Sequence, residues 1–233
     1  MCLILVAYRV TSGFPLVVAA NREEFHARPA ERAAFWKDRP AILAGRDLKA
    51  MGTWMGVSRT GRFAAVTNYR GGHDPNAAES RGLLVARFLE NAITASAYAS
   101  EVAHRGRAYS GFNLLAEDQK ELWWYSNRGN GTEGVPRRLE PGICGVGNFL
   151  LDTPEIAEHK TRFADSLESG PSIEPLFGVL AAARIVAPEF GTRCSTVLIR
   201  GSDGQLQFAE RAFDVAGAEL ETVRFEPRLK GKT

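Results

Sequence analysis

The sequence has few cysteines, no long hydrophobic run and no excess of charge of either sign. Its 233 residues contain three cysteines at wide spacing, which predicts neither a disulfide framework nor a zinc site and favours a reducing, cytoplasmic setting. No stretch approaches the roughly 18 apolar residues of a membrane span, and the run Leu3–Ala7 is too short for a signal peptide. A net charge of +2 argues against nucleic-acid binding, and the four histidines show no metal-ligand spacing.

What is present is the composition of a globular protein with a core. Hydrophobic residues make up 45% of the chain and charged residues 24%, which are ordinary values for a folded domain. The length fits one domain or two small ones, and no internal repeat, low-complexity tract or linker divides the chain. We therefore expect a single domain over 1–233, whose partner is a small-molecule substrate or ligand.

Two strands are predicted at the N-terminus. Leu3–Ala7 is a short aliphatic run, and Leu16–Ala20 repeats that pattern after the turn signal Ser12-Gly13-Phe14-Pro15. Together these segments predict a β-hairpin, which brings its two outer ends together. The hairpin therefore places Asn21-Arg22-Glu23-Glu24 beside residue 2.

The rest of the chain alternates between strands and helix pairs. We expect strands over 52–57, 62–67, 112–116, 122–126, 195–200, 205–211 and 222–226, one strand ending near 148, a turn at 128–131 and an irregular stretch over 27–50. We expect helices after Gly82, over 94–104, from Thr153 to about 167, and from 173 onward. Hairpin connections make the sheets mostly antiparallel, and two helix pairs can cover two sheets. The fold class predicted is α+β, a four-layer αββα sandwich.

Cys2 directly follows the initiator methionine, and removal of that methionine is expected before so small a residue. A terminal cysteine then carries its own base, because its α-amine and its thiol both titrate close to neutral pH. The alternative is that Cys2 is only a small buried residue at the start of a strand.

The charged residues after the second strand bear on this choice. Arg22 beside Cys2 would favour the thiolate, and Glu23 or Glu24 would anchor the terminal ammonium or orient Arg22. The alternative for this segment is a turn with solvated charges.

Three further polar residues lie at strand ends. The amide of Asn68 can donate to a developing oxyanion, or it can serve a turn. Asn148 follows Gly145-Val146-Gly147, a backbone that lets a ligand approach closely or simply turns. Arg193 follows Gly191-Thr192 and can bind a carboxylate or phosphate, or pair with a surface acid.

Several motifs occur together in one order between Met1 and about Arg211. They are Cys2, Asn21-Arg22-Glu23-Glu24, Gly45-Arg46-Asp47-Leu48, Gly52-Thr53-Trp54, Thr67-Asn68-Tyr69-Arg70, Ser80-Arg81-Gly82, Gly147-Asn148, Leu151-Asp152-Thr153-Pro154, Gly191-Thr192-Arg193 and Ser195-Thr196. In this respect the chain resembles the NRDE family, also called the transport and Golgi organisation family. It departs from the family at position 23, which is Glu instead of Asp, and after Pro154, where the family more usually has Trp.

The resemblance implies an N-terminal-nucleophile (Ntn) hydrolase-like fold and, by analogy with cysteine amide hydrolases such as bile-salt hydrolases, a set of residue roles. Cys2 would be nucleophile and base, Arg22 its electrostatic partner, and Glu23 or Glu24 the acid. Asn68 and Asn148 would be the oxyanion and substrate-positioning amides. The substrate-binding residues would be Asn21, Tyr69 and Arg193.

Three functions remain open at this level. The first is a cysteine hydrolase of non-peptide amide bonds or thioesters that requires no cofactor. The second, also implied by the resemblance, is a non-catalytic protein that binds or traffics haem or an acyl lipid, for which Cys2, His26 and His73 are the candidate haem ligands. The third is an interaction module on an inactive scaffold. Cys2 discriminates among them, because only hydrolysis requires it.

Overall fold

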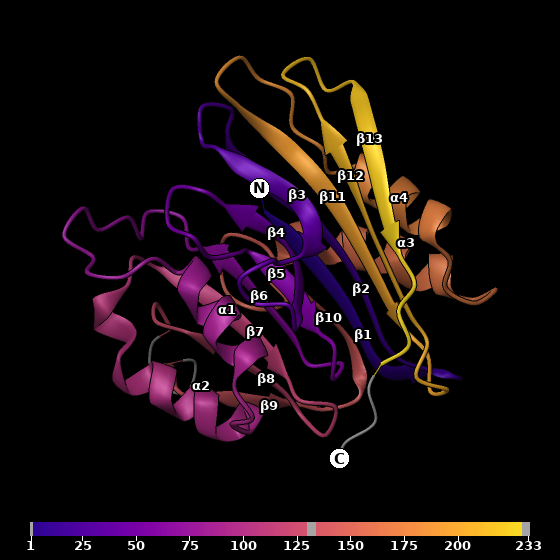
Figure 1. The fold of residues 1–233 in the computed structure, drawn as a ribbon, viewed down its shortest axis with the longest axis horizontal. Coiled ribbons are helices and arrows are strands. Elements are labelled where there is room, and N and C mark those ends of the chain that lie inside the picture. Colours follow the sequence, from indigo (N-terminus) through magenta and orange to yellow (C-terminus); the bar gives the residue numbers. More distant parts are fainter. Residues whose placement is uncertain (1, 130–133, 230–233) are drawn as a thin grey trace. The chain divides into compact units, whose positions relative to one another are not determined.

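The structure is a computed structural model that describes residues 2–129 and 134–229 (Figure 1). The chain forms two compact units. Unit 1 comprises Met1–Arg28, Pro141–Gly147 and Leu151–Thr233, and unit 2 comprises Pro29–Glu140 and Asn148–Leu150. The single domain expected over 1–233 stays a prediction.

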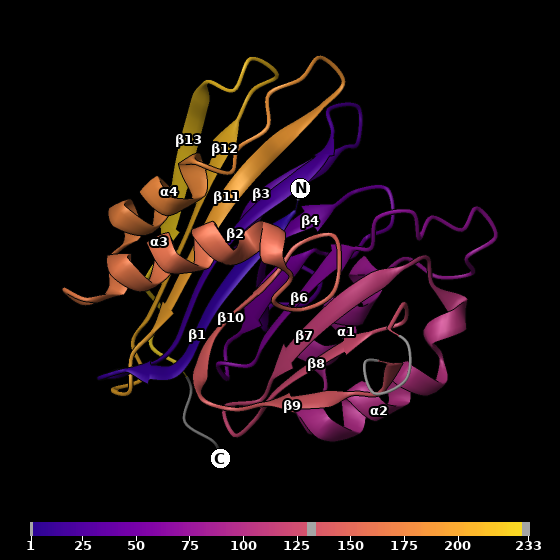
Figure 2. The same ribbon diagram turned by 180° about the vertical axis from the view of Figure 1, so that it is seen from behind.

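Unit 1 contains a six-stranded antiparallel sheet with the strand order β10-β1-β2-β11-β12-β13. The strands are β1 (Leu3–Thr11), β2 (Phe14–Phe25), β10 (Gly142–Val146), β11 (Phe190–Arg200), β12 (Leu206–Phe213) and β13 (Glu219–Phe225). The helices α3 (Ala157–Leu167) and α4 (Ile173–Ala181) lie along this sheet, as Figure 2 shows.

The core of unit 1 lies between these helices and one face of the sheet. Leu3, Leu5 and Ala7 of β1 pack there with Phe163 of α3 and Leu176 of α4. Alternate residues of a strand point to opposite faces, so the odd-numbered residues in the first half of β1 face the helices. The even-numbered ones, with Cys2 before them, face the other side.

Unit 2 contains a seven-stranded antiparallel sheet whose strands follow one another in chain order. They are β3 (Ala30–Phe35), β4 (Ile42–Asp47), β5 (Met55–Ser58), β6 (Phe63–Asn68), β7 (Phe112–Glu117), β8 (Leu122–Ser126) and β9 (Arg137–Leu139). The helices α1 (Gly82–Glu90) and α2 (Ala95–His104) cover one face of it. Thr94 caps α2 by accepting a hydrogen bond from the backbone N–H of Ala97, as expected of a threonine at that position.

The predicted α+β class with mostly antiparallel sheets is confirmed, and so are the four helix positions. The irregular stretch expected over 27–50 is wrong, because β3 and β4 occupy half of it. β3 is short and largely exposed, and it pairs with β4 around a register shift between Glu31 and Ala34. The short strand β9 was not expected. The turn predicted at 128–131 lies partly outside the described residues.

The longest α-helix among the described residues, α3, has 11 residues. None of the described helices is long and apolar enough to cross a membrane.

Candidate functional site

The first hairpin brings Cys2 to the charged end of β2, as the sequence predicts. Leu3 pairs with Asn21 in the antiparallel register, so Cys2 lies at the level of Arg22. The thiol of Cys2 donates a hydrogen bond to the backbone carbonyl of Glu23 over 3.6 Å. Cys2 as a whole is half-buried.

The side chain of Glu23 on β2 is held in place by Thr192 of the neighbouring strand β11. The hydroxyl of Thr192 donates to Oε1 of Glu23 over 2.8 Å and accepts a hydrogen bond from the backbone N–H of Ile185. Only 2% of Glu23 is exposed. Burial raises the pKa of Glu23 to about 7, although the Thr192 hydrogen bond acts in the opposite direction. Glu23 can therefore exchange a proton near neutral pH.

Arg22 and Glu24 lie on the other face of β2, because alternate residues share a face. Arg22 is buried, and its Nη2 lies 3.7 Å from Oε2 of Glu24. Nε of Arg28 lies 3.6 Å from the same oxygen. The two acids that the sequence left as alternatives thus have different surroundings. Glu24 contacts Arg22, whereas Glu23 contacts Thr192.

A row of buried polar residues continues from Arg22 across β11 and β12. Cys194 pairs with Arg22 in the register, and its thiol lies 3.5 Å from Oε2 of Glu210, which also accepts from the hydroxyl of Thr196. Burial, together with the Glu210 carboxylate, raises the pKa of the Cys194 thiol well above its usual range, while Arg22 acts to lower it. Cys194 is therefore kept as an unreactive thiol.

Two residues predicted to bind substrate make hydrogen bonds within the fold. The amide of Asn21 donates to the Leu180 carbonyl over 3.0 Å and accepts from the Ser195 hydroxyl over 2.6 Å, joining β2 to α4 and β11. Nη1 of Arg193 lies within hydrogen-bond distance of the carbonyls of Phe25, His26 and Arg28. These contacts leave the predicted binding roles untested, but each residue already has a role in the fold.

Asn68, Tyr69 and Asn148 lie together in unit 2. The amide of Asn148 donates to the Asn68 carbonyl over 2.9 Å, and the backbone N–H of Arg70 donates to the Asn148 carbonyl over 2.7 Å. The Tyr69 ring packs edge-on against Phe149, with 6.2 Å between ring centroids. The structure thus brings the two predicted amide residues together.

Thr192 and Glu210 are the functional candidates that the sequence reasoning did not single out. Thr192 lies inside the motif Gly191-Thr192-Arg193, which could have indicated it. From that motif, however, a functional role was predicted only for Arg193. No local sequence pattern indicates Glu210. Its distinguishing feature is that it is buried and pairs with Thr196 of β11, which only the structure shows. Among the described residues no group of His, Cys, Asp and Glu is arranged to hold a metal ion.

The family model "Transport and Golgi organisation 2" matches residues 1–188. The chain belongs to this family. The Transport and Golgi organization protein 2 homolog of Bos taurus is 34% identical to it over 94% of each chain. The homolog of Homo sapiens is 31% identical over 92% of this chain and 93% of its own length.

Solved structures of Ntn hydrolases share the fold of this Transport and Golgi organisation 2 family member. The mutant C2A conjugated bile acid hydrolase from Clostridium perfringens superposes with a TM-score of 0.57 at 8% identity, over 99% of this chain and 94% of that one. The Caenorhabditis elegans ortholog of N-acylethanolamine-hydrolyzing acid amidase superposes with a TM-score of 0.50 at 11% identity, over 85% of this chain and 92% of its own. Identities this low establish the fold alone, and the Ntn-hydrolase-like fold predicted from the sequence is confirmed.

Proposed function

We propose that the protein is an N-terminal-nucleophile cysteine hydrolase that cleaves a non-peptide amide bond, or a thioester, through Cys2. The observation that carries the proposal is the half-buried Cys2 thiol, which donates to the backbone carbonyl of Glu23 at the level of the buried Arg22. A cationic neighbour on the same face of the sheet favours the thiolate.

The chemistry requires that methionine removal makes Cys2 the first residue. Its α-amine then takes the Sγ proton while sulfur adds to the substrate carbonyl carbon, which forms an S–C bond and an oxyanion. Collapse of this intermediate breaks the C–N bond, and the α-ammonium returns the proton to the leaving amine. Water then attacks the resulting thioester and loses a proton to the α-amine. The S–C bond breaks, the α-ammonium returns that proton to the sulfur, and a carboxylic acid and the free thiol are released.

Arg22 and Glu23 have separate tasks in this scheme. Arg22 supplies the positive charge that lowers the free energy of the Cys2 thiolate. The Glu23 carboxylate anchors the α-ammonium that forms during each proton transfer, and Thr192 holds that carboxylate in place. The assignment of Asn68 and Asn148 as oxyanion donors stays a prediction.

The test is intact-mass spectrometry of the purified protein before and after reaction with a β-lactone probe. We expect loss of Met1 and a single adduct that is absent from Cys2→Ala. Cys144→Ala is the matched control, because Cys144 is also a half-buried thiol of the same sheet and its loss should leave the adduct intact. A panel of amides and thioesters then identifies the bond that is cleaved.

Retained Met1, or an adduct that survives in Cys2→Ala, would contradict the hydrolase proposal. In that case the alternative role, binding of haem or an acyl lipid without catalysis, becomes the proposal to test. Its signature is different, because titration with haem or an acyl ligand should then give saturable binding without turnover, and Cys2→Ala need not abolish that binding.

A further inference from the structure

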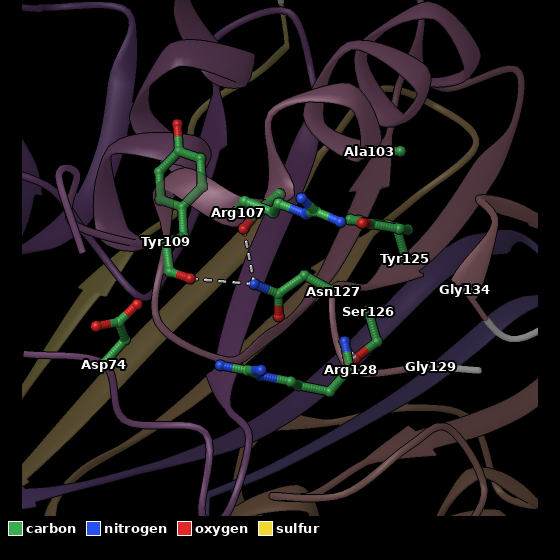
Figure 3. A pocket seen from close by; sticks show the side chains of 11 residues that line it. Asp74, Ala103, Arg107, Tyr109, Tyr125, Ser126, Asn127, Arg128, Gly129 and Gly134 are labelled. Atoms are coloured by element: carbon green, nitrogen blue, oxygen red, sulfur yellow. Dashed lines mark hydrogen bonds between the residues drawn. The ribbon is translucent and has the colours of Figure 1, made fainter. Parts of the chain in front are cut away.

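A cavity of about 450 Å³ lies in unit 2, where β8 ends near the C-terminal end of α2 (Figure 3). Its volume falls within the range of small-molecule sites. The side chains that matter for the argument are Asp74, Arg107, Tyr125, Asn127 and Arg128. None of them belongs to the Cys2 cluster.

Tyr125 is the first sign that a ligand belongs here. Only 5% of this residue is exposed, and its hydroxyl has no hydrogen-bond partner among the described residues. The hydroxyl lies against the backbone of Gly106, where an added Cβ would come within 2.8 Å of it. Burial raises the pKa of Tyr125, so the group is a phenol that can donate to an acceptor in the cavity.

Asn127, which lines the cavity, already uses its side-chain amide in internal hydrogen bonds. The Asn127 amide nitrogen donates to the carbonyls of Gly106 and Tyr109, and its oxygen accepts from the backbone N–H of Phe112. The Asn127 side chain is therefore fixed in place, and a ligand must bind to the other polar groups of the cavity.

Those other groups are mainly cationic. Arg107 is exposed and makes no ion pair or hydrogen bond with any residue in the described ranges. Arg128 is held in place, because its Nη2 donates to the Gly72 carbonyl over 3.3 Å. Its Nε also lies close to the backbones of Gly72 and Gly111. A Cβ added at Gly72 would lie 3.3 Å from this nitrogen, and one added at Gly111 would lie 3.0 Å from it.

We propose that this cavity binds the phosphate group of a small molecule, with Arg107, Arg128 and the Tyr125 hydroxyl as donors. Guanidinium groups bind phosphate and carboxylate oxygens with strong, charge-assisted hydrogen bonds. Asp74 favours phosphate, because a phosphate that keeps a proton can donate to the Asp74 carboxylate, whereas sulfate and carboxylate ions have no proton to give. This site goes beyond the hydrolase proposal and does not depend on it.

The test is calorimetric titration of the full chain with inorganic phosphate, sulfate and acetate at low ionic strength and pH 7. We expect saturable binding of phosphate that is tighter than binding of sulfate or acetate. Arg107→Gln, Arg128→Gln and Tyr125→Phe should each weaken phosphate binding about tenfold, the effect of losing one hydrogen bond to a charged group. Asp74→Asn should remove the preference for phosphate over sulfate.

The matched control is Arg138→Gln, which removes the same charge from an exposed position of β9 in the same unit. It should bind phosphate as the wild type does, and so should Cys2→Ala. No saturation by phosphate, or equal weakening by Arg138→Gln and the two cavity arginine variants, would overturn the proposal. Equal affinity of the wild type for phosphate and sulfate would overturn the role given to Asp74.

Discussion

At the scale of single residues, the end of β2 shows how neighbours in sequence acquire different chemistry. Arg22 and Glu24 share one face, whereas Asn21 and Glu23 lie on the other. Asn21 uses both ends of its amide for internal hydrogen bonds, and Glu23 is buried with Thr192. A motif of consecutive polar residues thus divides into structural and chemical members, because a strand alternates its side chains between its faces.

The buried carboxyl of Glu23 should make stability depend on pH. Its pKa is about 7 in the folded protein, raised by burial from an ordinary value of 4.5, so the folded state favours the protonated form. The stability contribution of that form is complete below about pH 4.5 and is lost as pH rises through 7. Glu23→Gln should therefore gain free energy of unfolding relative to the wild type, by about 2 kcal/mol or more, between pH 5 and pH 8.

Urea titrations of both proteins at several pH values provide this measurement. Thr192→Val is an informative companion variant, because it removes a hydrogen bond that favours the ionised form and should steepen the loss of stability with pH. A wild-type-minus-variant difference that stays constant from pH 5 to pH 8 would show that Glu23 is not buried as described.

Asn21 allows a structural role to be separated from a substrate-binding one. In Asn21→Ala, the Leu180 carbonyl and the Ser195 hydroxyl lose their partner while both residues stay buried. We expect the free energy of unfolding to fall by about 2–3 kcal/mol, measured by urea denaturation. Ser195→Ala removes only one of the two bonds and should cost less. Unchanged stability together with lost substrate turnover would instead support the binding role.

At the scale of elements, the sequence predicts what local signals determine. The N-terminal hairpin follows from a turn between two aliphatic runs, and α4 follows from apolar residues at helical spacing from Ile173 onward. β3 and β4 were not predicted because their arginine-rich segment has the composition of a loop. Its strand structure depends on the pairing of β4 with β5. The pairing of β2 with β11 escaped for another reason. Ser195 and Asn21 are 174 residues apart, and no local pattern specifies a partner at that distance.

The motif Gly52-Thr53-Trp54 has a packing explanation that can be tested. A Cβ on Gly52 would clash with the backbone carbonyl of Gly82 at the start of α1, and the backbone N–H of Thr53 donates to the same carbonyl. Gly52→Ala should therefore cost about 3 kcal/mol or more, because backbone atoms cannot yield as a flexible side chain can. Thermal and urea denaturation would measure the loss.

The matched control for this variant is Gly178→Ala in α4. An added Cβ at Gly178 meets nothing within 4 Å, and glycine is a poor residue inside a helix. Gly178→Ala should thus stabilise the protein by about 0.5–1 kcal/mol. If Gly52→Ala were as stable as the wild type, the loop before β5 could not pack against α1 as closely as described.

At the scale of the whole molecule, the two units differ in how their sheets are assembled from the chain. In unit 2 the strand order follows the chain order. In unit 1 the sheet joins both ends of the sequence, since β1 pairs with β10 and β2 pairs with β11. The cluster around Cys2 depends on these distant pairings, because Thr192 and Cys194 come from β11. The site therefore cannot form before β11 is available to pair with β2.

This difference predicts an order of folding. Closing a long loop costs more conformational entropy than closing a short one, and non-local strand pairing is slow. During refolding from urea, backbone amides of β4 and β5 should become protected before those at the β2–β11 pairing. Pulsed hydrogen exchange with mass spectrometry can follow peptides from each strand. Simultaneous protection of both sets, or earlier protection of β2 and β11, would mean that unit 1 forms without waiting for its most distant contacts.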